Sequence, residues 1–543
     1  MKTLCCLFYV VVLVSFLSGA VIHVPDQAPT IQQGINQAQR NDTVLVAEGT
    51  YYENISFKGK AITVTSHFIL DRKMSHIKKT IIDGSKATNP DSGSVVYFIS
   101  GEDTNSVLSG FTITGGKGTV WYYKTYKQRS GGGLFIRYGC TVENNIVTKN
   151  SMSGDVGCGA GLDVMTEAAY VSIIRNNRIE SNNIDTERAG VAGAQLGAKG
   201  RLIFSHNSII NNCTYSTIEG GIGGVYCWGD LVWNGKIEIY GNLIQGNIAK
   251  SNYPTGADAG GLLVVSTSPD VIKNVISYNI CDGTGGGIMV YLESAKIYPR
   301  FINDTIVRNK SKIYGGAISL HGPDVNALVR NCIVWDNRAL GAPMEIYDQC
   351  GLLDVSYTNI QGGWSGDGTG NTSIDPKLID SVITVDDTIF CCLSSNSPCI
   401  DGGDPNPYYF DMEDVNTPGI AKWPAMGTIK NDMGVYGGRY GIITGIDDQN
   451  EDPKIPSAVI LHQNYPNPFN PSTVIEFSIP ESRNVSLTIF DLLGRTVTTL
   501  VEARLNAGIY RYKWQPHDVP TGIYFYRLQC GEFNETKKMV LIR

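Results

Sequence analysis

Charged residues are scarce in this chain of 543 residues. Asp, Glu, Lys and Arg make up 17% of it, there are 7 His, and the formal net charge is −7. Nucleic-acid-binding domains usually carry a basic face, so we expect no nucleic-acid partner. The chain also has no phosphate-binding glycine loop, no His-Glu-x-x-His and no paired Cys-x-x-Cys motifs, which excludes the commonest nucleotide and zinc sites.

Long apolar runs are also absent, except at the start of the chain. Met1 and Lys2 provide a positive end, residues 4–17 form an apolar run too short to span a bilayer, and Ser18, Gly19 and Ala20 are small. This order is typical of a secretory signal peptide, which we predict to be cleaved after Ala20. The mature chain is therefore expected to be exported and to have no transmembrane segment.

The cysteines leave the disulfide pattern open. Removal of the signal peptide takes two of the 13 cysteines and leaves an odd number, so at least one thiol is predicted to be unpaired. Export permits disulfides. If a bridge exists, the best candidate joins Cys399 to Cys391 or Cys392, but cysteines inside a repeat protein serve equally well as small apolar residues.

One short pattern, Asn/Asp-x-Ile/Val-x-x-Asn/Asp, returns seven times between residues 145 and 336. A glycine followed by apolar residues keeps step with it, as in Gly133-Leu134 and Gly287-Ile288. A period of about thirty residues indicates a stacked-repeat architecture. The copies end at Asn150, Asn182, Asn212, Asn247, Asn279, Asn309 and Asp336.

The residue types in each repeat decide which elements stack. Both runs are short, rich in Ile, Val and Leu, and bounded by Gly or Asn, so they are interpreted as strands. Equivalent strands lie too far apart in the chain to pair as hairpins, which requires parallel pairing. Propeller, leucine-rich and helical repeats need other periods or residue frames. The sequence therefore predicts an all-β parallel β-helix.

Stacking makes two specific predictions. Asn tolerates the left-handed backbone region and suits corners, so the seven residues that end the copies should form a ladder of hydrogen bonds up the stack. Inward apolar side chains should form one column, rising by about 4.8 Å per coil. Its members are Val147, Ile179, Ile209, Ile244, Ile276, Ile306 and Ile333.

A short helix is predicted before the first coils. Ile31, Ile35 and Ala38 fall on one helical face, and Thr30 and Gln33 have capping-box spacing. We expect this helix to cover the open N-terminal end of the apolar column.

The opening of the chain resembles a known superfamily. Residues 30–32, 42–46, 49–51 and 53–55 (Thr-Ile-Gln, Asp-Thr-Val-Leu-Val, Gly-Thr-Tyr and Glu-Asn-Ile) are similar to the start of pectin-lyase-like right-handed parallel β-helix proteins. The resemblance implies that fold and a tendency to meet polysaccharides. It carries across no catalytic residue, because the esterase and galacturonase motifs of the superfamily are missing, and fold alone does not fix function.

The C-terminal segment carries a more specific resemblance. Residues 464–473, 485–495 and 520–527 resemble the C-terminal sorting domain of proteins exported by the type IX secretion system of Bacteroidetes-like bacteria. The resemblance implies contact with that machinery, passage through the outer membrane of a Gram-negative cell, and release or anchoring at its surface. Period-two alternation by itself predicts a small antiparallel β-sandwich.

Four parts of the chain follow from these features. They are a signal peptide at 1–20, the β-helix with its capping helix at 21–440, a polar acidic linker at 441–458, and the sorting domain at 459–543.

Residues 121–129 break the coil pattern and are interpreted as a loop. Sugar rings stack on aromatic faces, and Lys or Arg pairs with uronate or sulfate groups. The alternative is a solvated loop packed on the coil wall. The candidate ligand-binding residues are Trp121, Tyr122, Tyr123, Lys124, Tyr126, Lys127 and Arg129.

Asp163 is the first candidate for catalysis. Strand alternation directs it away from Leu162 and Val164, to the outside of its sheet. There it would act as a general base or acid, or would simply keep the surface soluble. The other candidates near it in sequence are Glu167, Arg178 and Glu180.

Acidic residues crowd a Gly/Pro-rich loop near the end of the β-helix. Oxygen-rich loops suit calcium, the one cofactor that the sequence suggests, although the spacing is not that of an EF-hand. Such an ion would be structural. The candidate ligands are Asp401, Asp404, Asp411 and Asp414.

Three functions stay open. The chain binds or handles extracellular polysaccharide on the long flank of its solenoid, or it is a polysaccharide lyase or glycoside hydrolase acting on a uronic-acid glycan, or it is an adhesin or structural cell-envelope protein. An enzyme site would lie on the outer sheet between about Gly133 and Gly287. The missing catalytic motifs favour the first function.

Overall fold

The computed structural model divides the chain into two compact units, Met1–Tyr440 and Gly441–Arg543. Residues 1–18 of the predicted signal peptide and the whole predicted linker lie outside the described residues. The structure describes all residues except 1–18, 124–125, 231–232, 253–255, 293–295, 342–344, 384–387, 415–416, 439–458, 462, 465–466, 471, 480–482, 506–507, 517–518, 532 and 543.

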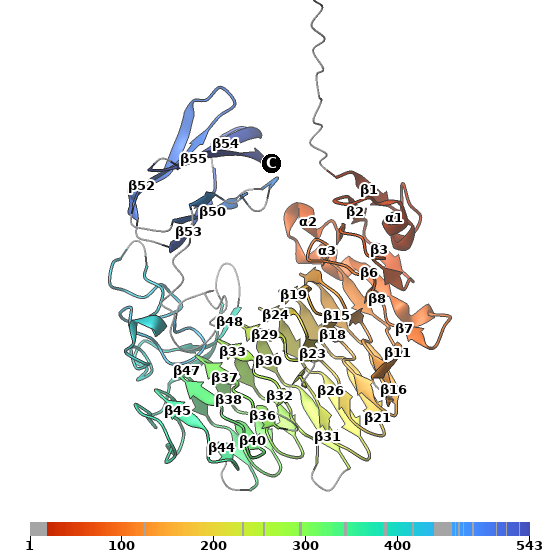
Figure 1. Ribbon diagram of the computed structural model, residues 1–543, viewed down its shortest axis with the longest axis vertical. Coiled ribbons are helices and arrows are strands. Elements are labelled where there is room, and N and C mark those ends of the chain that lie inside the picture. Colours follow the sequence, from red (N-terminus) through yellow and green to blue (C-terminus); the bar gives the residue numbers. More distant parts are fainter. Residues whose placement is uncertain are drawn as a thin grey trace, which may run out of the picture. The chain divides into compact units, whose positions relative to one another are not determined.

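The first unit is a parallel β-helix, which confirms the predicted fold (Figure 1). Each coil adds one strand to each of several sheets, and three long sheets enclose the core. The first sheet consists of β1 (Val21–Val24), β2 (Thr43–Val46), β5 (Thr63–Ser66), β9 (Val107–Ser109), β14 (Cys140–Glu143), β19 (Val171–Arg175), β24 (Arg201–Ser205), β29 (Lys236–Tyr240), β33 (Asp270–Ile272), β37 (Arg300–Ile302), β41 (Leu328–Arg330) and β45 (Asp354–Ser356).

The second sheet consists of β3 (Gly49–Tyr51), β6 (Thr80–Asp83), β10 (Thr112–Thr114), β15 (Ile146–Thr148), β20 (Arg178–Glu180), β25 (Ser208–Ile210), β30 (Leu243–Gln245), β34 (Val275–Ser277), β38 (Thr305–Val307), β42 (Ile333–Trp335) and β46 (Asn359–Ile360). The third sheet consists of β4 (Ile55–Ser56), β8 (Val96–Phe98), β13 (Leu134–Ile136), β18 (Leu162–Thr166), β23 (Ala194–Ala198), β28 (Val225–Trp228), β32 (Leu262–Val265), β36 (Ile288–Tyr291), β40 (Ile318–His321) and β44 (Ile346–Asp348).

Two narrower sheets lie between the second and third sheets in part of the coils. One consists of β16 (Ser151–Gly154), β21 (Asn183–Thr186), β26 (Cys213–Ser216), β31 (Ile248–Ser251), β35 (Ile280–Cys281), β39 (Lys310–Ser311) and β43 (Arg338–Ala339). The other consists of β7 (Ser92–Gly93), β11 (Gly118–Tyr123), β12 (Tyr126–Ser130), β17 (Gly157–Cys158), β22 (Gly190–Val191) and β27 (Gly221–Ile222).

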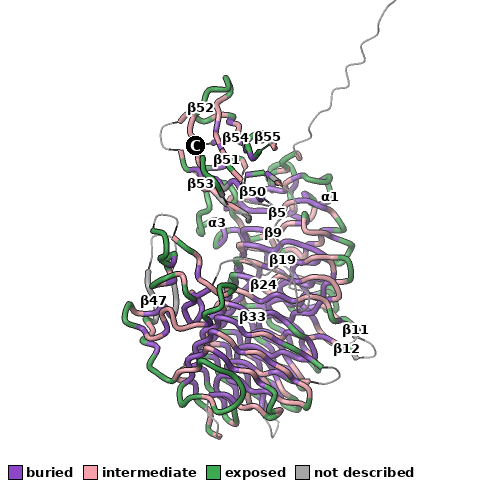
Figure 2. The backbone as a smooth tube through the Cα atoms, turned by 60° about the vertical axis from the view of Figure 1, so that its left-hand side comes forward, coloured by how far each residue is buried: buried purple, intermediate pink, exposed green. Residues whose placement is uncertain are grey.

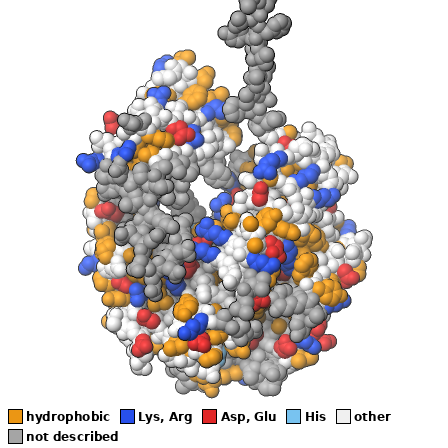
Figure 3. All heavy atoms as spheres, in the orientation of Figure 1, with side chains coloured by type: hydrophobic (Ala, Val, Ile, Leu, Met, Phe, Trp, Pro, Cys, Tyr) orange, Lys and Arg blue, Asp and Glu red, His pale blue; other side chains and the backbone are white. Residues whose placement is uncertain are grey.

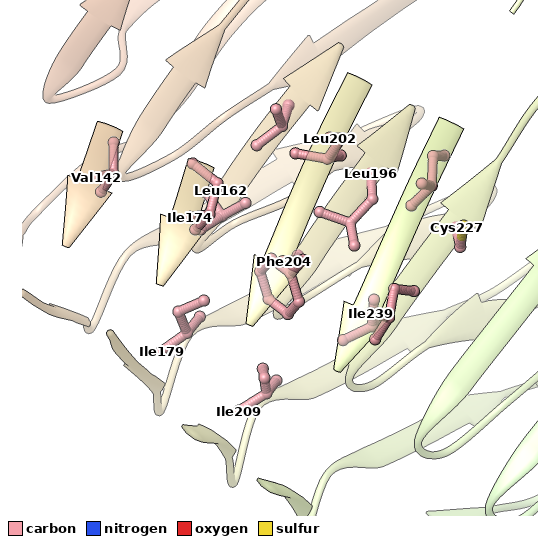
Figure 4. Packing of buried hydrophobic residues seen from close by; sticks show 14 of the residues in the cluster. Val142, Leu162, Ile174, Ile179, Leu196, Leu202, Phe204, Ile209, Cys227 and Ile239 are labelled. Atoms are coloured by element: carbon pink, nitrogen blue, oxygen red, sulfur yellow. The ribbon is translucent and has the colours of Figure 1, made fainter. Parts of the chain in front are cut away.

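The predicted apolar column exists, with one correction. Val147 pairs with Ile179, Ile179 with Ile209, and the file continues without a shift to Ile306. These side chains are fully buried, and neighbouring inward residues fill the same core (Figures 2 and 4). The next member is Val334, not Ile333, because Ile306 pairs with Val334.

The predicted ladder exists up to Asn309, and each of its members makes the same contacts. The Asn182 amide nitrogen Nδ2 donates to Asn212 Oδ1 at 3.0 Å and to the Val147 carbonyl at 3.0 Å. Asn182 Oδ1 in turn accepts from the Asn150 backbone N–H at 3.1 Å. A second ladder, which the sequence did not predict, joins Asn145, Asn177, Asn207, Asn242, Asn274 and Asp304 at the preceding corner.

The prediction of Asp336 as the last ladder residue is wrong. Asn309 Nδ2 donates to Asn337 Oδ1 at 2.9 Å, and Asp336 adopts a left-handed φ of 53°. In this fold the left-handed residue stands before each ladder residue, as Ser181 does before Asn182. The sequence pattern accepts either Asn or Asp at its last position. It therefore places the end of the seventh copy at Asp336, one residue before the true ladder residue Asn337.

The predicted N-terminal helix is confirmed as α1 (Ile31–Gln37). The Thr30 hydroxyl accepts from the Gln33 backbone N–H at 3.1 Å, as a helix N-cap should. Ile31 and Ile35 are fully buried in the same core cluster as the first coils. Two unpredicted helices, α2 (Phe68–Asp71) and α3 (Met74–Lys79), join β5 to β6, and short 3₁₀ turns occupy η1 (Gly84–Lys86) and η2 (Pro407–Tyr409).

The segment after the last coil packs against the outside of the second sheet. It begins with a hairpin of β47 (Leu378–Ile383) and β48 (Thr388–Leu393). Met433 and Val435 then cover the outward residues Val275, Val307 and Ile333, which explains why Ile333 is buried outside the column. The segment therefore covers a flank of the solenoid.

The structure contains no bridge from Cys399 to Cys391 or Cys392. Cys399 is a thiol that accepts a hydrogen bond from Asn359 Nδ2 at 3.2 Å. Burial raises its pKa to about 11. Of the two alternatives that the sequence left open, a bridge or a small apolar residue, Cys399 follows the second and packs beneath the flank segment.

The second unit is the predicted antiparallel sandwich. One sheet consists of β49 (Ile460–Leu461), β50 (Thr473–Ile479) and β53 (Gly508–Trp514), and the other of β52 (Thr496–Leu505), β51 (Arg483–Phe490), β54 (Gly522–Cys530) and β55 (Phe533–Leu541). Phe477 from the first sheet and Leu487 and Tyr526 from the second share one buried cluster.

Candidate functional site

Asp163 is buried, and the expectation of an outward acid in contact with water is wrong. Leu162 and Val164 point into the core, as alternation predicts, and Asp163 lies on the outer side of β18 with a relative exposure of 0%. Arg137 Nη2 donates to its Oδ2 at 2.8 Å. The Arg137 guanidinium lies 3.8 Å from the centre of the Phe135 ring, and Trp121 of the β11–β12 hairpin packs edge-on against Phe135. The hairpin therefore covers the ion pair.

The environment of Asp163 is that of a structural ion pair. Burial raises the pKa of Asp163, while the charge and the hydrogen bond of Arg137 oppose that rise. Its second oxygen, Oδ1, accepts no hydrogen bond within the described part of the chain. Breaking the pair by removing one partner would leave an uncompensated buried charge.

The other predicted acid–base residues do not converge on Asp163. Glu167 pairs with Lys199 Nζ at 2.9 Å. Arg178 and Glu180 pair with each other on β20, which belongs to a different sheet. The four candidates therefore form three separate ion pairs and no common site.

The predicted loop at 121–129 is a β-hairpin of β11 and β12. Tyr122 is 61% exposed and Lys127 is exposed, whereas the Arg129 guanidinium donates to the carbonyls of Pro90 and Gly118. Lys124 and the side chains of Tyr123 and Tyr126 lie outside the described residues. Among the remaining candidates, Trp121 and Tyr122 present aromatic surface, and ligand contact stays a prediction.

The four acidic candidates for calcium do not form one site. The Asp401 carboxylate accepts from the Thr428 hydroxyl at 2.8 Å, Asp404 pairs with Arg330 at 3.3 Å, and Asp411 accepts from the backbone N–H groups of Asp432 and Gly438. Asp414 lies farther along the same segment, where its N–H donates to Ile420. Within the described ranges, no three His, Cys, Asp or Glu side chains are grouped to hold a metal ion.

A groove that the sequence did not reveal runs along the outer face of the third sheet. Its first hollow has a volume of about 410 Å³. The floor is formed by outward residues of successive strands, and the wall by segments of the narrower sheet beside it. The floor residues are Met165, Gln195, Tyr226, Trp228, Leu263, Val265, Met289 and Tyr291, and the wall residues include Cys158, Val191, Ile222 and Asp258.

The groove continues along the stacking axis. A second hollow of about 790 Å³ shares Asp258, Met289 and Tyr291 with the first and extends to Tyr314 and His321. Register explains this shape, because Trp228 pairs with Val265 and Val265 with Tyr291 on consecutive coils. The outward residues thus form files that run along the solenoid.

Two polar groups of the groove, Gln195 and Asp258, are buried wholly or in part. Gln195 is only 6% exposed, and its Oε1 accepts no hydrogen bond from the described residues. Burial, followed by the nearby charge of Glu219, raises the pKa of Asp258 to about 6. No Lys or Arg occurs among the described lining residues. Elsewhere, charged side chains are scattered over the face visible in Figure 3.

The strands themselves held a signal for this groove. A strand that faces water on one side should alternate apolar with polar residues. At Val225–Trp228, Leu262–Val265 and Ile288–Tyr291 both sides are apolar or aromatic. An outer face of this kind on three consecutive coils marks a surface with a use beyond solubility.

Comparison with known proteins identifies the second unit. Residues 463–542 match the family described as Secretion system C-terminal sorting domain, which confirms the resemblance seen in the sequence. The match implies secretion or attachment to the cell surface in Bacteroidetes. No curated protein is significantly similar to the chain. No helix in the described residues is long and apolar enough to cross a bilayer.

Proposed function

We propose that this chain, exported by way of its C-terminal sorting domain, binds an extended polysaccharide along the groove of its β-helix. The carrying observation is the continuous file of aromatic and apolar residues across successive coils. Sugar rings bury their apolar faces on aromatic side chains, while their hydroxyl groups need polar partners at the rim. The groove offers both.

The spacing of the aromatic residues suits a chain of linked rings. Trp228 on β28 and Tyr291 on β36 are in register and two strands apart. Neighbouring strands are about 4.8 Å apart, so these side chains are roughly 10 Å apart along the axis, a separation comparable to the length of a disaccharide. A glycan that lies parallel to the axis meets one side chain after another.

Binding by the full secreted chain tests the proposal. Affinity electrophoresis in gels that contain soluble β-glucan, xylan, mannan, polygalacturonate or alginate should retard the wild-type protein in at least one gel. Tyr291→Ala should weaken that binding about tenfold, because the side chain is 40% exposed in the groove. Tyr298→Ala is the matched control, since Tyr298 is an exposed tyrosine outside the groove lining.

Two outcomes contradict the proposal. One is the absence of binding to every polysaccharide, which would favour an adhesin or structural role. The other is equal binding by wild type and Tyr291→Ala, which would place the site elsewhere, for example on the exposed Trp121 and Tyr122 of the hairpin.

Asp258 favours a second candidate function, glycan cleavage. A carboxyl group with a pKa of about 6 is close to the range in which general acids and bases work. A glycoside hydrolase needs a second carboxylate across the bond, and the exposed Glu219 is an acid whose charge raises the pKa of Asp258. New reducing ends, or unsaturated ends that absorb ultraviolet light, after incubation with the same panel would establish cleavage, and Asp258→Asn should abolish it.

A further inference from the structure

We infer that the groove selects neutral polysaccharides and discriminates against uronic-acid and sulfated ones. The inference rests on the proposed polysaccharide-binding function and names the substrate class of the same groove. Its basis is the kind of polar and charged group that the groove presents to a ligand.

Two polar groups of the groove, Gln195 and Asp258, offer hydrogen-bond acceptors. Gln195 Oε1 is buried in the floor without a donor among the described residues. The Asp258 carboxylate lies in the wall shared by both hollows, and its oxygens can only accept once it is ionised. Sugar hydroxyls can donate to such atoms, whereas carboxylate and sulfate groups can only accept. A neutral glycan therefore satisfies these atoms, and an anionic group would leave them unsatisfied.

The charges beside the groove point the same way. Two of the cations on neighbouring coils are already paired, Arg137 with Asp163 and Lys199 with Glu167. Around Asp258 the neighbours are acidic, because Glu219 influences it directly and Asp282 accepts from the adjacent backbone N–H of Ala257. Repulsion between like charges across an interface weakens the binding of a partner that carries the wrong charge. A uronate chain would meet acids and find no described lysine or arginine in the lining.

The apolar part of the groove supports the same selection. Leu263 and Val265 are buried between the aromatic residues and form a continuous cluster with Ile222 and Val191. An anionic substituent on every ring would have to be desolvated against this surface without compensation. Neutral pyranose rings bury a carbon–hydrogen face there instead.

Neutral and anionic oligosaccharides of matched length test the inference. Isothermal titration of the full chain should show at least tenfold tighter binding of a neutral glucan, xylan or mannan oligosaccharide than of oligogalacturonate or oligoalginate of the same length. Asp258→Asn should narrow that ratio severalfold by removing the negative charge. Met289→Lys places a cation between the two hollows. It should narrow the affinity ratio further by strengthening the binding of the uronate oligosaccharides.

The outcomes separate this inference from the proposed function. Equal or tighter binding of the uronate oligosaccharides, weakened by Tyr291→Ala, would overturn the inference and leave the proposed function standing. No binding of either class would overturn both. An unchanged ratio in Asp258→Asn, with the unfolding midpoint of that variant also unchanged, would show that charge in this wall does not select the ligand and would overturn the inference.

Discussion

The corners of the β-helix and the outer face of its third sheet come from the same coils but follow opposite rules. At the corners, Asn182, Asn212 and Asn247 repeat one residue type and one set of contacts. On the outer face, the aligned position changes from Gln195 to Tyr226 with each coil, and polar atoms are left unsatisfied. Stacking demands identity where buried amides bond to one another. It places no such demand on the outer face, where residue types can differ from coil to coil.

Loss of one corner amide should have the largest effect. Asn212→Ala removes the acceptor for both the backbone N–H and the Nδ2 of Asn182, and leaves the Ile179 carbonyl without its side-chain donor. Each buried polar group left unsatisfied costs about 1–3 kcal/mol, so the free energy of unfolding should fall by roughly 3–5 kcal/mol. Urea denaturation followed by circular dichroism measures this loss.

Asn183→Ala is the matched control, because Asn183 follows the ladder residue Asn182 but is exposed. Its effect should stay within about 0.5 kcal/mol. A loss in Asn212→Ala no larger than in this control would show that the ladder does not hold the coils together.

One member of the second ladder has a buried polar atom without a hydrogen-bond partner in the described structure, as Gln195 has in the groove. Asp304 replaces Asn in the second ladder, is fully buried, and its Oδ2 has no hydrogen-bond partner in the described structure. Burial raises the pKa of Asp304 well above its ordinary value. Asp304→Asn restores the residue type of the ladder and should raise the free energy of unfolding by roughly 1–2 kcal/mol at pH 7.

The pH dependence of that gain has a defined sign. The folded protein keeps the Asp304 proton, whereas the unfolded chain releases it above about pH 4. Wild-type stability should therefore fall as pH rises from there toward the folded-state pKa, and Asp304→Asn should remove that slope. Equal stability of the two proteins from pH 4 to pH 8 would contradict a protonated Asp304.

Groove variants should separate function from stability. Tyr291→Ala should change the free energy of unfolding by no more than about 0.5 kcal/mol, since surface substitutions rarely exceed that value. The same variant is expected to lose about tenfold in glycan affinity. Thermal unfolding measured beside the binding assay checks both, and a large drop in the unfolding midpoint would make Tyr291 part of the scaffold.

The periodic sequence patterns predict the fold of this chain, but they do not predict the groove. Parallel stacking and the apolar column follow from a pattern that repeats along the chain, and α1 and the sandwich follow from local alternation of apolar and polar residues, so all four can be predicted from sequence. The groove is built from outward positions that differ from coil to coil, such as Gln195 and Met289, and from the distant wall residue Asp258. The exposure of Asp163 was not predictable, because strand alternation gives only the side of the sheet on which a residue lies. The hairpin that covers that side lies some forty residues earlier in the chain.

The smallest expected effect concerns the charge of Asp258. Its pKa of about 6 means that it ionises between pH 5 and pH 7, with Glu219 and Asp282 as its acidic neighbours. A hydrogen bond to a carboxylate is stronger than one to a neutral carboxyl group, by roughly 1 kcal/mol. Binding of a neutral oligosaccharide should therefore tighten by about fivefold across this range.

The same titration should act in the opposite direction on an anionic ligand. As Asp258 ionises, repulsion should weaken any residual binding of oligogalacturonate, so the two affinity profiles should diverge between pH 5 and pH 7. Asp258→Asn should flatten both profiles, and isothermal titration at three pH values is sufficient to see it. Parallel profiles for the two ligands would mean that the groove face, unlike the corners, does not use its incompletely partnered polar groups.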